Sequence, residues 1–264
     1  MLRTHLTTEL GLRYPLIGAP MANLAGGELA RAITQAGGLG MIGVGSHDSA
    51  EFVAREAAAA RRGNPSIRFG IGVMAWDVVR RPQLMAAVIA ARPFLASVSF
   101  GTVRPHVARL HDAGILATTQ VHDSAETVAA TEAGVDLIVV QGTEAGGHTG
   151  AVATMPLLQI VLRTTTLPVV AAGGIATAAG MAAGAEGVWV GTAFIASPEC
   201  GCQPTAISAI LAARETDTIR THAFDRAQGI PWPAQFPGRA LRNDFTDRWH
   251  EHQDQMAADP SARL

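Results

Sequence analysis

The sequence predicts an α/β fold made of eight strand–helix units, and three observations support it. Segments rich in Val, Ile and Leu alternate with alanine-rich segments along the first 214 residues. Each pair takes about thirty residues, the length of a strand and a helix in a parallel sheet. The alternation then stops, and a tail follows that holds PWP, the aromatic residues Phe236, Phe245 and Trp249, and mixed charges. Eight units favour a (β/α)8 TIM barrel first and a doubly wound sheet second.

The predicted strands are short apolar runs bounded by glycine, proline or polar residues. Their ranges are 15–21, 39–44, 69–74, 95–101, 115–121, 137–142, 168–174 and 187–195. The predicted helices are 27–36, 49–62, 82–92, 103–113, 124–133, 155–165, 177–183 and 205–214. Glycines 37, 63, 114 and 134 each follow a predicted helix, as a terminating glycine should, and Ser124 suits an N-cap. The seventh helix is short, because only eleven residues separate Ile175 from Gly187.

Two domains follow from this pattern: a barrel over residues 1–214 and a C-terminal extension over 215–264 that packs on it. Hydrophobic residues make up 48% of the chain and charged residues 16%, with a net charge of -2. These values indicate a globular protein with a large core and no attraction to nucleic acid or acidic membranes. The N-terminus lacks a secretory apolar region, and no run of roughly eighteen apolar residues occurs, so a cytoplasmic protein is expected.

Composition also restricts the chemistry. All 20 basic residues are arginine, which excludes mechanisms that need a lysine Schiff base, pyridoxal phosphate enzymes included. Cys200 and Cys202 form a C-x-C pair, which is a poor disulfide and at best half a metal site, so no metal is expected. We interpret these cysteines, together with His222, His250 and His252, as structural or surface residues.

Two stretches, 38–43 and 70–75, match the dinucleotide fingerprint by letter. That fingerprint needs its glycines in a turn between a strand and a helix, whereas these glycines lie before or within predicted strands. Strands seven and eight end differently, in AAGGI and VGTAF. The loops after these two strands commonly bind phosphate in (β/α)8 barrels, because backbone N–H groups converge there. Glycines would let the backbone approach the phosphate oxygens; two tight turns are the alternative.

The sequence QGTEAGGHTG, residues 141–150, follows the sixth strand and therefore lies on the same rim. Its glycines let the loop lie against something flat and bulky, and His148 can then point into the mouth as a base or hydrogen-bond donor. Glu144 either interacts with His148 or caps the loop. Gln120, which ends the fifth strand, both donates and accepts and so suits the amide-like edge of a flavin; an ordinary hydrogen bond at the mouth is the alternative.

Taken together, these residues resemble the FMN-dependent nitronate monooxygenases, formerly called 2-nitropropane dioxygenases. The resemblance covers nearly the whole chain and rests on Ala19-Pro20-Met21, 36–40, 141–150, 171–175 and 187–194, with a similar tail at 231–249. It implies oxidation of a small anionic alkyl nitronate by O2 to a carbonyl compound and nitrite, with FMN as the cofactor.

The resemblance also implies roles for individual residues. His148 falls on the family's catalytic histidine, which takes a proton from a neutral nitroalkane or orients the nitronate. The implied FMN contacts are Pro20, Met21 and Ala22 under the ring, Gln120 and Gln141 at its edge, Gly146 and Gly147 beside it, and Gly173, Gly174, Gly191 and Thr192 at the phosphate. The chain departs from the family at Gly72, where many members carry an asparagine, and in the short seventh helix.

Two other functions stay open. One is an FMN-dependent NAD(P)H oxidoreductase on the same barrel, a quinone or enoyl-thioester reductase. The other is a barrel that binds a phosphate-bearing ligand without flavin. The aromatic tail is compatible with a homodimer.

Overall fold

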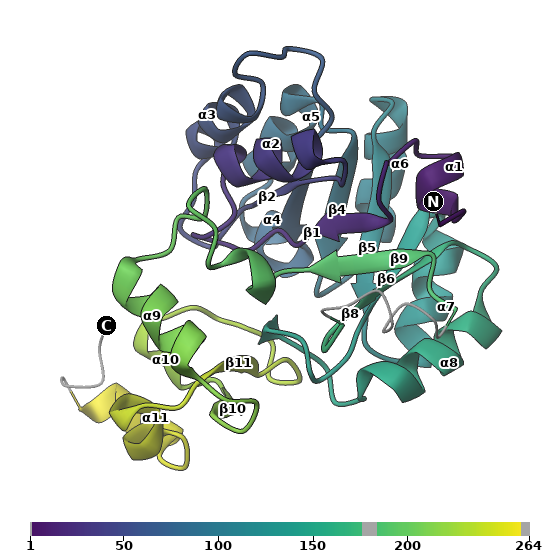
Figure 1. The fold of residues 1–264 in the computed structure, drawn as a ribbon. Helices are drawn as coiled ribbons and strands as arrows, with labels where there is room; N and C mark the ends of the chain where they lie inside the picture. The colour runs from purple at the N-terminus through teal and green to yellow at the C-terminus, as the bar shows by residue number, and fades with distance from the viewer. Residues whose placement is uncertain (1, 176–183, 260–264) are drawn as a thin grey trace.

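The computed structural model describes residues 2–175 and 184–259 (Figure 1). Its main sheet has eight parallel strands in the order β1-β9-β8-β6-β5-β4-β3-β2. These strands are β1 Leu16–Gly18, β2 Met41–Gly43, β3 Gly70–Met74, β4 Leu95–Ser99, β5 Leu116–Val121, β6 Leu137–Gln141, β8 Val169–Ala172 and β9 Gly187–Val190. The sheet bends into a barrel, since the Gly18 N–H donates to the Leu39 carbonyl at 2.8 Å and Leu39 N–H donates to Leu16 at 2.9 Å. This closure confirms the predicted barrel and excludes the doubly wound sheet.

Helices follow the strands as predicted. They are α2 Gly27–Ala36, α3 Ala50–Ala60, α5 Gln83–Ala91, α6 Arg104–Asp112, α7 Ser124–Ala133, α8 Thr154–Thr164 and α9 Pro204–Ala212. Two short α-helices within residues 2–175 were not predicted, α1 His5–Thr8 and α4 Ala75–Arg80. The N-cap of α7 is Asp123, whose carboxylate accepts from Glu126 N–H at 2.8 Å, and not the predicted Ser124. The short helix expected at 177–183 lies outside the described residues.

The predicted strands 168–174 and 187–195 were too long. Strand β8 ends at Ala172 because Gly173 and Gly174 adopt φ values of 112° and 69°, far from the extended backbone of a parallel strand. Strand β9 ends at Val190, and a 3₁₀ helix, η2 Thr192–Phe194, replaces the rest. The two fingerprint-like stretches do run into β2 and β3, so they are parts of the barrel wall.

The core has two layers, as alternation along the strands requires. Leu137 and Val139 of β6 face the barrel interior, where they meet Met41 and Trp189. Ile138 and Val140 face outward and pack under the helices. This packing fixes the directions of the strand ends, which carry the rim.

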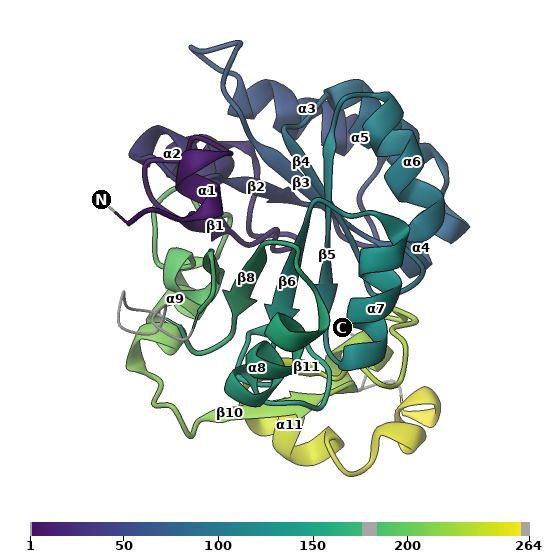
Figure 2. The ribbon, with the colours of Figure 1, turned by 90° about the vertical axis from the view of Figure 1, so that its right-hand side faces the viewer.

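The C-terminal region forms a second, three-stranded sheet in the order β10-β11-β7. Its members are β10 Thr218–Thr221, β11 Gly238–Leu241 and β7 Gly147–His148, with helices α10 Ala223–Ala227, α11 Asp244–Trp249 and η3 Gln253–Ala258 beside them. Figure 2 shows the arrowheads of β6 and β8 pointing toward β10 and β11, so this region lies at the carboxyl ends of the barrel strands. The division at residue 214 stays a prediction. No helix within 2–175 and 184–259 is both long and apolar enough to span a membrane.

Candidate active site

The loop after β6 is held by two arginines from the C-terminal region. The guanidinium of Arg239 donates to the Thr143 carbonyl at 2.6 and 3.0 Å. Arg220 donates to the carbonyl of Thr149 at 3.0 Å and to that of Gly150. Burial, with the nearby charge of Arg239, lowers the pKa of Arg220. The planar fork of arginine reaches two acceptors at once, and so both ends of the loop are tied to the same sheet.

His148 lies between these two anchors, on β7. It pairs with Gly238 of β11 in the antiparallel ladder. A methyl group on Gly238 would lie 3.2 Å from Nε2 of His148, tighter than ordinary van der Waals contact. Gly238 therefore gives the imidazole the space beside β11 that it occupies.

Two side chains of the C-terminal region fix the ring of His148. Its Nε2 lies 3.0 Å from each carboxylate oxygen of Asp225. Trp232 stacks on it, with ring centroids 3.5 Å apart and planes 9° from parallel. Nδ1 of His222 approaches the same carboxylate at 3.1 Å, and its Nε2 lies 3.1 Å from the Ala234 carbonyl. His222, expected to be structural or superficial, thus lies within the group that surrounds His148.

The residues predicted at the phosphate do come together. A methyl group on Gly146 would lie 3.0 Å from Oγ1 of Thr192, and one on Gly191 would lie 3.2 Å from Sδ of Met21. One on Gly173 would lie 2.9 Å from the Ala145 nitrogen. The loops after β6, β8 and β9 and the segment after β1 therefore converge on one part of the rim.

This part of the rim fits a phosphate group. The backbone N–H groups of Gly173, Gly174, Gly191 and Thr192 donate to no other described residue. Gly174 and Thr192 are exposed, and Gly173 and Gly191 are half-buried. Unpaired, convergent N–H groups in a glycine-rich turn form a concavity suited to an anion. Metal ions or lysines are not needed for such binding.

The predicted floor of the site, residues 20–22, runs across the neighbouring strands. Ala22 forms a parallel bridge with Gly43. A methyl group on Gly72 would lie 2.4 Å from Cγ of Pro20. The departure at Gly72 is therefore explained: the proline ring fills the space that an asparagine side chain would need.

Gln141 is held by a histidine that the sequence analysis missed. Oε1 of Gln141 lies 2.8 Å from Nε2 of His122, and Nδ1 of His122 lies 2.8 Å from a carboxylate oxygen of Glu126. The same oxygen accepts from the His122 backbone N–H at 2.8 Å. Because a carboxylate can only accept, Nδ1 of His122 donates to Glu126, and Nε2 is left to pair with the side-chain amide of Gln141. The amide of Gln141 is thus fixed by a chain that reaches the surface at Glu126.

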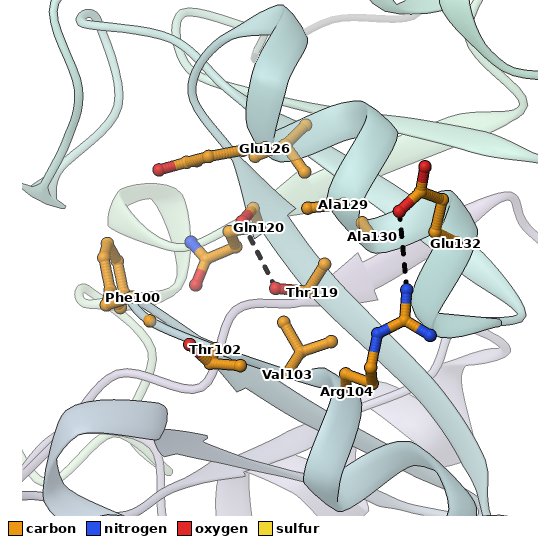
Figure 3. A pocket seen from close by; sticks show the side chains of 12 residues that line it. Phe100, Thr102, Val103, Arg104, Thr119, Gln120, Glu126, Ala129, Ala130 and Glu132 are labelled. Atoms are coloured by element: carbon orange, nitrogen blue, oxygen red, sulfur yellow. Dashed lines mark hydrogen bonds and ion pairs between the residues drawn. The ribbon is translucent and has the colours of Figure 1, made fainter.

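Gln120 lies at the edge of a cavity of about 320 Å³ between the β4 and β5 units (Figure 3). Figure 3 shows Phe100 and Gln120 on one side of this cavity and the ion pair of Arg104 with Glu132 on the other. No described residue hydrogen bonds to the side-chain amide of Gln120. The amide is therefore open to a ligand.

Aromatic side chains join the cavity edge to His148. Phe100 stacks on His122 at 5.3 Å and meets Trp232 and Phe236 edge-on at 4.9 and 5.2 Å. Trp76 meets Trp232 at 5.4 Å. The PWP tripeptide and Phe236 were the sequence signals for this wall, and they did not show where Trp232 would lie.

Glu144 does not contact His148. Its carboxylate accepts from the N–H and the hydroxyl of Thr154, each at 2.9 Å, at the start of α8. Burial raises the pKa of Glu144, but these hydrogen bonds outweigh it, so the pKa lies below the usual carboxyl value. Of the two alternatives for Glu144, the capping role is the one that the structure has.

Comparisons with known proteins identify the family of the chain. The sequence model of the nitronate monooxygenase family matches residues 65–263. A probable nitronate monooxygenase from Staphylococcus saprophyticus is 29% identical over 97% of this chain and 83% of that protein. A hydroxy-methyl-oxo-octahydroindene-carboxyl-CoA dehydrogenase from Rhodococcus jostii is 30% identical over 97% of this chain and 70% of that protein.

Solved structures give the same result. FabK from Thermotoga maritima has a TM-score of 0.86 at 30% identity, covering 98% of this chain and 81% of that one. The nitroalkane oxidase from Streptomyces ansochromogenes has a TM-score of 0.78 at 28% identity, covering 91% and 80%. The class is therefore a TIM-barrel oxidoreductase of the flavin-dependent type. Within that class, the chain belongs to the nitronate monooxygenase family.

Proposed function

We propose that this protein oxidises alkyl nitronates with O2 to a carbonyl compound and nitrite, using FMN. One observation carries the proposal: His148 stands on the same loop, residues 141–150, that approaches the N–H groups after β8 and β9, which donate to no other described residue. Family membership and the likeness to a nitroalkane oxidase support the same chemistry. The substrate is a small anion and O2 is the second reactant.

The proposed roles follow the geometry. Gly173, Gly174, Gly191 and Thr192 would hold the FMN phosphate through their N–H groups. Met21, Gly146 and Gly147 would lie against the ring, with Pro20 and Ala22 as its floor and the amides of Gln120 and Gln141 at its edge. FMN, when bound, supplies the electron transfer between substrate and oxygen.

The remaining work falls to the chain itself. Trp232 covers one face of the imidazole, and Phe100 packs edge-on against Trp232, so this face is shielded from bulk water while Nδ1 stays accessible. His148 removes the α-proton of a neutral nitroalkane, where one is the substrate, and orients the resulting nitronate. A base of this kind contributes roughly 10²- to 10⁴-fold to a proton transfer.

A second function has one observation in its favour. The Rhodococcus relative is a dehydrogenase of a CoA thioester, so an FMN-dependent NAD(P)H oxidoreductase acting on an enoyl thioester or a quinone is the alternative. The flavin-free barrel loses its support, because the family to which the chain belongs is flavin-dependent.

Anaerobic stopped-flow reduction separates the two functions. FMN-loaded protein is mixed with ethyl nitronate in one set of experiments and with NADH or NADPH in another, and the flavin absorbance is followed. Reduction by the nitronate without a response to either nucleotide is expected. Rapid reduction by NADH or NADPH with no response to the nitronate would establish the reductase. A protein that stays colourless after incubation with FMN would overturn both.

A further inference from the structure

The carboxylate of Asp225 lies beside the imidazole of His148 near the rim, although Asp225 is 77 residues further along the chain. Both of its oxygens face Nε2 of His148 at 3.0 Å, and its side chain is 10% exposed. A carboxylate that is nearly removed from water needs hydrogen-bond donors. Nε2 of His148 and Nδ1 of His222 are placed to supply them.

This contact fixes where the proton of His148 resides. An ionised carboxylate can only accept, so Nε2 of His148 is the donor and carries the proton. In the neutral imidazole the lone pair then belongs to Nδ1. No described residue hydrogen bonds to this Nδ1, and the atom is not fully buried.

We infer that Asp225 is a positioning residue that holds His148 with its proton on Nε2, so that Nδ1 is the atom that accepts the substrate proton. This inference rests on the proposed function. In the step, the C–H bond of the nitroalkane breaks, its electron pair stays on the substrate as the nitronate, and an N–H bond forms at Nδ1. The imidazolium so produced lies 3.0 Å from the Asp225 carboxylate, which stabilises its charge.

The remaining contacts of the ring support this role. Trp232 fixes the plane of the imidazole by stacking, while Asp225 fixes its rotation within that plane. His222 holds the carboxylate from its other side through Oδ2. The base is thus assembled from the loop after β6 and the segment between β10 and β11.

The test uses full-length, FMN-loaded protein with Asp225→Asn. The matched control is Asp247→Asn, because Asp247 lies in the same C-terminal region and only approaches Arg242 at 3.9 Å. Turnover is measured with neutral nitroethane and with preformed ethyl nitronate, which needs no deprotonation. We expect kcat with nitroethane to fall by about 10²-fold or more, and this loss to exceed the loss with nitronate at least about tenfold. Asp225→Glu should recover part of the nitroethane activity, and Asp247→Asn should match the wild type.

A second measurement does not depend on turnover. The ring nitrogens of His148 are observed in ¹⁵N-labelled protein and assigned by their loss in His148→Asn. The wild type should carry the proton on Nε2 and leave Nδ1 unprotonated, and Asp225→Asn should shift protons toward Nδ1, because the amide can donate to Nε2.

Two results would overturn the inference: an unchanged tautomer in Asp225→Asn, or equal losses with nitroethane and nitronate, which a purely structural role would give. If the wild type oxidises neither substrate, the proposed function fails, and the tautomer still decides whether Asp225 sets the proton.

Discussion

The two halves of the rim are built in opposite ways. Around Gly173 and Gly191 the site consists of backbone, contributed by loops whose glycine N–H groups donate to no other described residue. Around His148 it consists of side chains, contributed by a region that begins about seventy residues later. The backbone half is therefore set by short loop sequences next to the strands that carry them. The side-chain half depends instead on how the C-terminal region packs against the loop that carries His148. This difference predicts that cofactor binding and proton transfer can be lost separately.

The largest expected effect is on the side-chain half. His148→Asn removes the base but keeps a polar group on β7, so the turnover of neutral nitroalkanes should fall by about 10²- to 10⁴-fold while FMN is retained. Steady-state kinetics and the flavin content of the purified protein measure the two quantities. His111→Asn is the control, because His111 pairs with Asp136 on the outer side of the barrel. Unchanged turnover in His148→Asn would remove its role as base.

The backbone half is tested by Gly173→Ala. Gly173 has φ at 112°, and a methyl group there would lie 2.6 Å from Oγ1 of Thr154 and 2.9 Å from the Ala145 nitrogen. The loop must move, so FMN affinity should weaken by at least about tenfold, an effect of about 1.4 kcal/mol. Fluorescence titration with FMN measures it.

Gly134→Ala is the matched control for that strain. Gly134 also has a positive φ, 82°, but a methyl group there meets nothing within 4 Å. It should cost stability alone, about 1 kcal/mol, without any change in FMN affinity. Equal FMN affinities in Gly173→Ala and the wild type would contradict the assignment of this loop to the phosphate.

Most of the fold could be predicted because it repeats. Apolar runs such as 137–140 predict buried strands, and glycines mark the ends of the helices between them. All eight barrel strands could therefore be predicted. The boundaries near Gly173 and Val190 were missed because apolar residues continue past the point where the backbone leaves the sheet. The predicted phosphate rim needed only backbone placement, and the structure does bring its loops together.

The residues that surround His148 could not be predicted from the sequence in the same way. Nothing in the letters of residues 222–236 indicates that Asp225 and Trp232 meet His148, since that contact depends on pairing between β7 and β11. Likewise, His122 follows a strand and could have been suspected by position, but its bond to Gln141 joins two units 19 residues apart. Long-range pairing has no local signature in one sequence.

A smaller effect is expected from Gly238→Ala. The added methyl group would lie 3.2 Å from Nε2 of His148 and would push the ring from Asp225 without touching the backbone half. Turnover of neutral nitroalkanes should fall a few-fold, about 1 kcal/mol or less in the barrier, at an unchanged FMN affinity. Parallel losses of turnover and FMN affinity would show that the two halves are coupled through the loop.

The smallest effect is expected at Glu144, which caps α8 and lies on the loop that connects the two halves of the rim. Its pKa is lowered in the folded state by the hydrogen bonds from Thr154, so its stabilisation is fully present above the unfolded value near 4.5 and is lost as pH falls through the folded pKa. Glu144→Gln should therefore lower Tm near neutral pH, by no more than about 2 °C because the group is exposed, and the difference should vanish in acid. Thermal unfolding from pH 3 to pH 7 measures it, with Glu215→Gln as the control because Glu215 is exposed and no described residue hydrogen bonds to its side chain. A Tm difference that persists at pH 3 would mean that Glu144 acts through packing and not through its charge.

FMN affinity is the sharper readout for the comparison of the two halves, because the capped helix supports the loop that carries both Gly146 and His148. If Glu144→Gln lost FMN affinity and turnover together, the coupling between the two halves would lie at this carboxylate.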